Sequence, residues 1–145
     1  RWARDASGRP VRESFFMSRA FETPSGFTLM TSPQFQSQTP AVLEQRLRMI
    51  AATARSVRRL HAAGLFHQDL FWQHVFFERD NEEGLIARLI DLQRLAQPGP
   101  AKSWYYWWKD MEQIRFSMQR MRCSAAEVEF WYRQYFAESG RARLM

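Results

Sequence analysis

The sequence predicts an α+β fold that is mainly helical and contains one short β-hairpin. Three observations predict it. Apolar residues recur at helical spacing over a long segment, residues 40–63. Two apolar runs, 74–77 and 85–90, flank a polar turn that contains a glycine. Two further amphipathic segments, 104–121 and 124–136, follow the hairpin.

The composition is that of one globular domain. The 145 residues are 46% hydrophobic and 15% aromatic, which is enough to build a core. Cys123 is the single cysteine, so the chain forms no internal disulfide and suits a reducing compartment. The net charge is +6, and all basic residues except Lys102 and Lys109 are arginines. An anionic partner and an arginine-rich genome explain that bias equally well.

The first part of the chain is predicted to hold one strand and a linker. Ser14–Phe21 is a short apolar and aromatic run, which indicates a buried strand. Residues 22–40 are rich in Ser, Thr, Gln and Pro, which is typical of a linker. We place a boundary between residues 1–38 and a main domain at 39–145. Because the chain does not begin with Met, we expect it to be a piece of a longer protein.

A long helix is predicted after the linker. Thr39 can cap it, Pro40 suits its first turn, and Gly64 follows its end. One stripe of the helix is apolar and predicts its buried face: Leu43, Leu47, Ile50, Ala54, Val57 and Leu60. The other side carries arginines: Arg46, Arg48, Arg55, Arg58 and Arg59. We expect these arginines to form a solvated surface rather than an anion-binding strip.

Two more helices are predicted after the hairpin. The first has a core stripe with steps of three and four: Trp104, Trp107, Met111, Ile114, Met118 and Met121. Ser124–Glu127 is a capping box for the second. The apolar face of that helix is Val128, Trp131, Tyr135 and Phe136. At least half of the rings in Trp104–Trp108 are therefore expected in the core, with membrane-interface contact as the alternative.

Two aspartates are placed on loops at the ends of the predicted hairpin. Asp69 precedes the first strand and Asp91 directly follows the second. Because a hairpin returns the chain to its start, we expect the two carboxylates to be close in space. Phosphoryl transfer needs one carboxylate to orient the attacking hydroxyl and accept its proton, and another to hold Mg²⁺. Asp69 suits the first role and Asp91 the second.

The spacing resembles the protein-kinase catalytic loop, a His-x-Asp followed by a metal-ligand position and a later aspartate. Three positions depart from that pattern. Gln68 replaces arginine, His74 replaces asparagine, and Asp91-Leu92-Gln93 replaces Asp-Phe-Gly.

These departures resemble the lipopolysaccharide kinases, which phosphorylate heptose or Kdo in the core oligosaccharide. That family has His-Arg-Asp and Cys-His-Phe where this chain has His67-Gln68-Asp69 and Gln73-His74-Val75. It has Ile-Asp-Leu-His-Arg where this chain has Ile90-Asp91-Leu92-Gln93-Arg94. The likeness also includes Leu60–Gly64, Ser14–Met17 and Lys109-Asp110.

The resemblance implies a protein-kinase-like C-lobe, whose short hairpin carries the catalytic and metal-binding loops. It implies that residues 1–38 are the end of an N-lobe with the hinge strand. ATP and Mg²⁺ are the implied cofactors, and lipopolysaccharide core or a lipid A-linked sugar is the implied acceptor. We expect a bacterial protein in the cytoplasm, peripheral on the cytoplasmic face of the inner membrane. No signature of nucleic-acid binding is present in the sequence.

The site residues are assigned from these motifs. Asp69 is the catalytic residue, and His67 belongs to the same loop with a mainly structural part, through a bond to backbone near Asp91. His74 is placed with Asp91 at the metal and beside the nucleotide. A structural role for His74 is an equal alternative, because imidazole is a softer ligand than Mg²⁺ prefers. Asp110 is expected to hold the backbone amides of the catalytic loop.

Further contacts are implied at the edges of the site. The hinge residues Met17, Ser18 and Ala20 are assigned to the nucleotide. Arg94 contacts phosphate or substrate, or else forms a surface salt bridge.

The sequence lacks two parts of a kinase nucleotide clamp. Its glycines, at 8, 26, 64, 84, 99 and 140, are too far apart for a glycine-rich loop. Both lysines follow Asp91, so no upstream lysine is present to hold phosphate. We expect weak or no phosphate transfer by this chain alone. The alternatives are a non-catalytic pseudokinase-type binding module and another small-molecule kinase, resembling the aminoglycoside and choline kinases.

Overall fold

The structure is a computed structural model that describes residues 21–81 and 84–137. Its helices are α1 (Gly26–Thr31), α2 (Pro40–Ala62), α3 (Pro100–Arg120) and α4 (Ala125–Phe136). Its strands are β1 (Val75–Asp80) and β2 (Gly84–Leu89), which pair antiparallel. Three 3₁₀ turns lie between them: η1 (Pro33–Gln36), η2 (Trp72–His74) and η3 (Leu92–Arg94). The predicted mainly helical α+β fold with one hairpin is confirmed.

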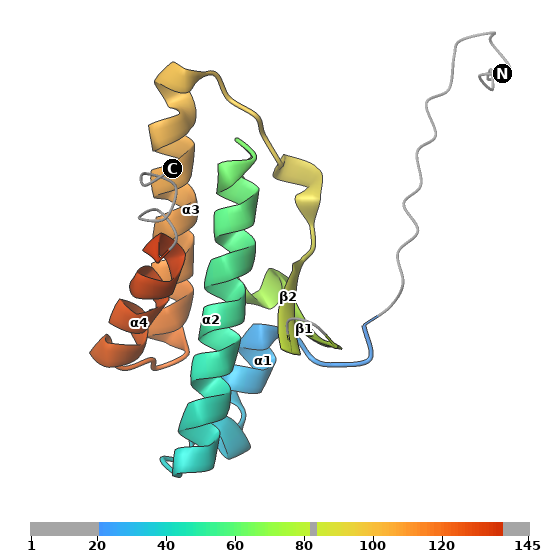
Figure 1. Ribbon diagram of the computed structural model, residues 1–145, viewed down its shortest axis with the longest axis vertical. Coiled ribbons are helices and arrows are strands. Elements are labelled where there is room, and N and C mark those ends of the chain that lie inside the picture. Colours follow the sequence, from blue (N-terminus) through green and yellow to red (C-terminus); the bar gives the residue numbers. More distant parts are fainter. Residues whose placement is uncertain (1–20, 82–83, 138–145) are drawn as a thin grey trace, which may run out of the picture.

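The long helix α2 is the centre of the molecule. Figure 1 shows α3 and α4 on one side of α2 and the hairpin on the other. Ile50, Ala54 and Val57 of its predicted stripe are fully buried. Gly64 follows its end with a φ of +72°, a left-handed conformation that glycine adopts without strain. Around α2 the largest fully buried side chains are Trp72, Trp131, Met30, Leu70, Ile114, Met118 and Met121.

The segment predicted to be a linker instead contains α1 and η1. The Ser25 hydroxyl caps α1 by accepting the backbone N–H of Thr28 at 3.3 Å. Met30 is fully buried, and a Cβ added at Gly26 would stand 2.9 Å from the Phe77 ring. The polar composition was misleading because Ser, Thr and Pro here begin and end short helices rather than marking a solvated chain. The boundary at residue 38 stays a prediction.

Arg46 shows that the prediction of a solvated arginine face was wrong at one position. Its side chain is 5% exposed. Nε donates to Glu127 Oε1 at 2.6 Å and Nη2 to Oε2 at 3.1 Å. Nη1 donates to the carbonyl oxygen of Phe35 at 3.0 Å. Since Glu127 also completes the capping box with Ser124, this one ion pair joins α2, η1 and the start of α4.

The predicted core stripe of α3 is confirmed at Met111, Ile114 and Met118, which are buried. It is wrong at Trp104, which is 68% exposed. Figure 1 gives the reason, because the first turns of α3 extend past the neighbouring ends of α2 and α4. Tyr105 and Trp108 of the same turns are also about half exposed.

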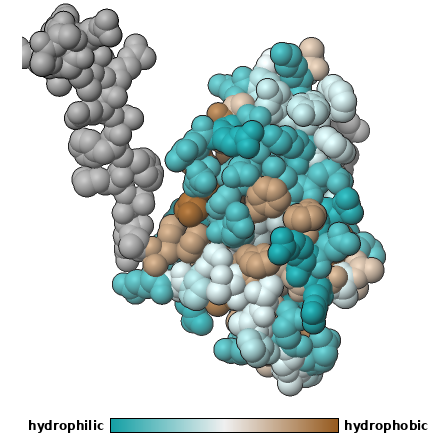
Figure 2. All heavy atoms as spheres, turned by 180° about the vertical axis from the view of Figure 1, so that it is seen from behind, coloured by the Kyte–Doolittle hydropathy of each residue, from teal (hydrophilic) through white to brown (hydrophobic). Residues whose placement is uncertain are grey.

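The surface is that of a chain with its main apolar faces buried. Seen from behind in Figure 2, hydrophilic side chains cover most of the molecule, and hydrophobic ones gather near the middle of that face. Among the described residues, no helix combines the length and apolar composition that crossing a membrane requires.

Replacing Glu127 by alanine is expected to destabilise the fold by about 3–5 kcal/mol, because Arg46 would be left buried without its counter-charge. The measurement is the free energy of unfolding in urea. Glu129→Ala is the matched control on the same helix, since Glu129 is 70% exposed and pairs with Arg133 in solvent. Its effect should stay within about 0.5 kcal/mol. Equal effects of the two substitutions on the free energy of unfolding would contradict the stabilising role of the buried ion pair between Arg46 and Glu127.

The same ion pair predicts a loss of stability in acid. Burial by itself would raise the pKa of Glu127, but the hydrogen bonds from Arg46 and Ser124 and the charge of Arg46 together outweigh it, and the pKa lies below its ordinary value of 4.5. The contribution is therefore present above pH 4.5 and is lost as pH falls through the lower folded pKa. Urea midpoints from pH 7 to pH 3 should fall more steeply for the parent than for Glu127→Gln. Parallel curves would show that Glu127 is not responsible.

Candidate active site

The loop after α2 and the loop after β2 are joined by backbone hydrogen bonds. Phe66 and Ala96 exchange two bonds, each 2.9 Å long, as an isolated antiparallel bridge. Further along, Ile90 N donates to the carbonyl oxygen of His74 at 3.0 Å. These bonds fix the two loops against each other at one end of the hairpin.

Two residues of these loops have a left-handed backbone, with φ of 66° at Gln68 and 59° at Asp91. For residues other than glycine this conformation costs about 1–3 kcal/mol and persists only where neighbouring contacts impose it. At Gln68 the contacts are clear: its N–H donates to Asp110 Oδ1 at 2.7 Å, and its side-chain Nε2 donates to the carbonyl oxygen of Arg94 at 2.8 Å. Gln68 thus links the catalytic loop directly to η3.

Asp110 and Gln113 of α3 hold the catalytic loop through its backbone. Asp110 is fully buried, and its Oδ2 accepts the N–H of His67 at 2.8 Å while Oδ1 accepts that of Gln68. One turn later, Gln113 accepts the N–H of Leu70 at 2.7 Å and donates to the carbonyl oxygen of Gln68 at 3.1 Å. The contacts of Asp110 are the expected ones. Gln113 was missed, although its position three residues after Asp110 places both on one helix face.

His67 is buried, and both of its ring nitrogens are used. Nε2 donates to the carbonyl oxygen of Ile90 at 2.8 Å, and Nδ1 accepts the N–H of Asp69 at 3.3 Å. The ring is therefore neutral, with its proton on Nε2. The expected bond to backbone near Asp91 is present. His67 sets the position of Asp69 relative to the end of β2.

His74 lies between the two aspartates. Its Nδ1 donates to the backbone carbonyl oxygen of Asp69 at 2.8 Å, which leaves Nε2 unprotonated in the neutral ring. Nε2 is 3.7 Å from Asp91 Oδ2, and Nδ1 is 3.8 Å from Asp69 Oδ2. In the neutral ring, the lone pair of Nε2 faces Asp91 Oδ2, and a cation between the two atoms would stabilise this arrangement.

Asp69, His74 and Asp91 together form a cluster that can hold a divalent cation. One ligand atom from each lies within 4.8 Å of the others. Asp69 and His74 are half-buried and Asp91 is exposed, so the cluster is open to solution. The two carboxylates suit Mg²⁺, which takes one or two of them and fills its remaining positions with water and phosphate oxygens. The predicted closeness of the two carboxylates is confirmed.

The structure does not test the contacts predicted for Arg94 and for the hinge residues. The Arg94 side chain is exposed on η3, and its contact with phosphate stays a prediction. Met17, Ser18 and Ala20 lie outside the described residues, as does nearly all of the predicted strand Ser14–Phe21.

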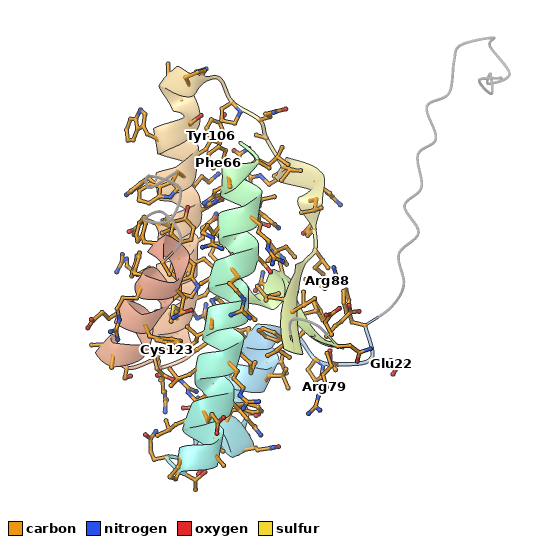
Figure 3. The ribbon with its side chains drawn as sticks, in the orientation of Figure 1. Glu22, Phe66, Arg79, Arg88, Tyr106 and Cys123 are labelled. Atoms are coloured by element: carbon orange, nitrogen blue, oxygen red, sulfur yellow. The ribbon has the colours of Figure 1, made fainter. Side chains whose placement is uncertain are left out.

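A hollow lies away from the cluster, among α1, α2 and the tip of the hairpin. It is open and has a volume of about 1300 Å³. Glu22 and Arg79, both labelled in Figure 3, line it together with Arg48 and Arg55. Neither carboxylate of the cluster lines this hollow.

One family model and one solved structure match this chain. The model of the lipopolysaccharide kinase (Kdo/WaaP) family matches residues 28–135. A solved structure described as WaaP in complex with acyl carrier protein matches with a TM-score of 0.60 and 19% sequence identity. The match covers 86% of this chain and 55% of that chain. The curated proteins contain no match.

The structural match is evidence of the fold. At 19% identity the likeness to WaaP shows the fold alone, and it confirms the predicted protein-kinase-like architecture. The present chain spans about half the length of that structure.

Proposed function

The chain belongs to the lipopolysaccharide kinase (Kdo/WaaP) family, and from this membership we propose that it is the catalytic part of an ATP-dependent phosphotransferase. The proposed acceptor is a hydroxyl of heptose or Kdo in lipopolysaccharide core or on a lipid A-linked sugar. The observation that carries the proposal is the cluster of Asp69, His74 and Asp91, whose ligand atoms lie within 4.8 Å of one another.

The residues of the cluster divide the work of phosphoryl transfer. Mg²⁺, when bound, neutralises charge on the phosphate oxygens. Asp91 and Nε2 of His74 would hold it. Asp69 orients the acceptor hydroxyl and takes its proton. Because His67 accepts the N–H of Asp69 and His74 donates to its carbonyl oxygen, the backbone of Asp69 is fixed on both sides, which favours catalysis by positioning.

Only part of a nucleotide site is encoded in this chain. The sequence has no glycine-rich loop and no lysine before Asp91. The nucleotide contacts of Met17, Ser18 and Ala20 remain part of the proposal. We infer that these 145 residues alone transfer phosphate weakly or not at all.

A non-catalytic binding module of the pseudokinase type is the second candidate. It is favoured by His74, because a neutral imidazole is a softer ligand than Mg²⁺ prefers. The cluster of Asp69, His74 and Asp91 and the family match favour an enzyme over a binding module. The same match favours a lipopolysaccharide kinase over a kinase of aminoglycoside or choline type.

Two partners are proposed besides the sugar acceptor. The similar WaaP structure contains acyl carrier protein, which supports a carrier-protein partner for this chain too. The first turns of α3 expose Trp104, Tyr105 and Trp108 next to Lys102. Amphipathic rings beside a cation suit an anionic lipid surface, which supports peripheral association with the cytoplasmic face of the inner membrane.

Divalent metal binding is the first test. Mn²⁺ added to the ¹⁵N-labelled chain should broaden the resonances of His74 and Asp91 selectively, and Asp91→Asn should weaken binding about tenfold or more. Asp80→Asn is the matched control, since Asp80 lies at the far end of the same hairpin. Uniform broadening, or unchanged affinity in Asp91→Asn, would reject the metal site.

Two substitutions at His74 distinguish a metal ligand from a residue that only supports the loop, when metal binding is titrated in each variant. His74→Asn should keep or improve Mg²⁺ binding, because an amide oxygen is a harder ligand than imidazole nitrogen. His74→Ala should weaken it. If His74 only supports the loop, the two variants will bind metal equally.

Phosphate transfer tests the function itself. The full-length product of the gene, incubated with labelled ATP, Mg²⁺ and lipopolysaccharide core, should phosphorylate a heptose or Kdo hydroxyl. Asp69→Asn should lower kcat by about 10²–10⁴-fold, because the group that accepts the proton is lost. Asp80→Asn should leave kcat unchanged. Metal binding without any transfer would favour the binding module.

A further inference from the structure

A chain of buried hydrogen bonds leads from α4 to the catalytic loop. Trp107 Nε1 donates to the hydroxyl oxygen of Tyr135 at 2.9 Å. The same hydroxyl lies 2.7 Å from His61 Nδ1. His61 Nε2 lies 3.1 Å from Asp110 Oδ2, the oxygen that also accepts the N–H of His67. Residues on α2, α3 and α4 are thereby connected to the loop that carries Asp69.

The direction of each bond follows from what each group can donate. The indole N–H of Trp107 can only donate, so the oxygen of Tyr135 accepts there. The carboxylate of Asp110 accepts from backbone amides and can only accept from His61 as well, which places the proton of His61 on Nε2. In the neutral ring, Nδ1 of His61 is then an acceptor, and Tyr135 donates its hydroxyl proton to it.

The part of this hydrogen-bond chain from Tyr135 to Asp110 is largely shielded from water. The side chains of His61 and Asp110 are 5% and 0% exposed, and Tyr135 is 6% exposed. The His61 ring stacks on Phe66, which is labelled in Figure 3, with a centroid distance of 5.0 Å. Burial raises the pKa of Tyr135 above its ordinary value, so the hydroxyl keeps the proton that it donates. In such surroundings a missing partner is costly, because water cannot replace it.

We propose that Tyr135 is a positioning residue for the catalytic loop. Its hydroxyl keeps His61 in the tautomer that donates to Asp110, and Asp110 holds the backbone N–H groups of His67 and Gln68, the two residues before Asp69. The catalytic part of this inference rests on the function proposed above, since it assumes that Asp69 acts on the acceptor. Tyr135 itself acts only through His61 and Asp110.

The position of α4 is therefore linked to the geometry of the site. The N-terminal end of α4 is tied to α2 by Arg46 and Glu127, and Tyr135 lies in its last turn. A displacement of α4 would break the bond between Tyr135 and His61 without touching Asp69 or Asp91.

Tyr135→Phe is the test, because it keeps the ring and removes only the hydroxyl. In the parent chain, ¹⁵N spectra should show His61 with its proton on Nε2. In the variant they should show a tautomer mixture, and exchange of the His67 and Gln68 amide protons should become about tenfold faster. In the full-length protein, kcat should fall about tenfold while KM for the acceptor stays the same.

Two further variants separate positioning from general stability. Tyr132→Phe removes a hydroxyl one turn earlier on α4, and among the described residues no hydrogen bond joins Tyr132 to Tyr135, His61 or Asp110. It should leave the exchange rates and kcat unchanged. His61→Gln offers an amide that donates to Asp110 without Tyr135, so adding Tyr135→Phe to it should have no further effect on exchange.

The outcomes distinguish this inference from the proposed function. An unchanged His61 tautomer and unchanged amide exchange in Tyr135→Phe would overturn the positioning role, whether or not the parent transfers phosphate. Equal effects of Tyr132→Phe would overturn it too. If Tyr135→Phe alters amide exchange while the parent protein transfers no phosphate, the link from Tyr135 to the loop is supported and the kinase function is rejected.

Discussion

The arrangement of the site depends on one buried carboxylate, that of Asp110. A charge without exposure to water is stable only when hydrogen-bond donors surround it. Here the donors are the N–H groups of His67 and Gln68 and the ring of His61. They come from the catalytic loop and the last turn of α2. Asp110 can therefore be buried only when these two segments meet on α3, and the loop is fixed by the same requirement that stabilises the core.

Much of the fold could be predicted because the signals for it are local. The stripe along α2, the capping box of α4 and the turn between the strands each lie within a few residues of the element that they specify. The closeness of Asp69 and Asp91 followed from the hairpin alone. The bond that Asp110 makes to the loop was expected from the family resemblance, since no pattern within the sequence pairs residues 110 and 67.

The predictions failed where a distant partner or the shape of the whole molecule decides. Arg46 was assigned to the surface with its neighbours, but its counter-charge Glu127 is 81 positions away in the sequence. Trp104 continues a correct core stripe, yet its turn of α3 extends beyond the helices that would cover it. Tyr135 has the spacing of an ordinary core residue, and only the structure shows that its hydroxyl faces His61.

Gln68 has a consequence for how such a protein could be regulated. An arginine at this position of a kinase can respond to a phosphate added elsewhere, because it carries a charge that a new anion would attract. A neutral amide has no such response. Its bond to the carbonyl of Arg94 forms when the chain folds and needs no signal. In a kinase built on this loop, the contact between the loop and η3 would therefore form without a phosphorylation signal.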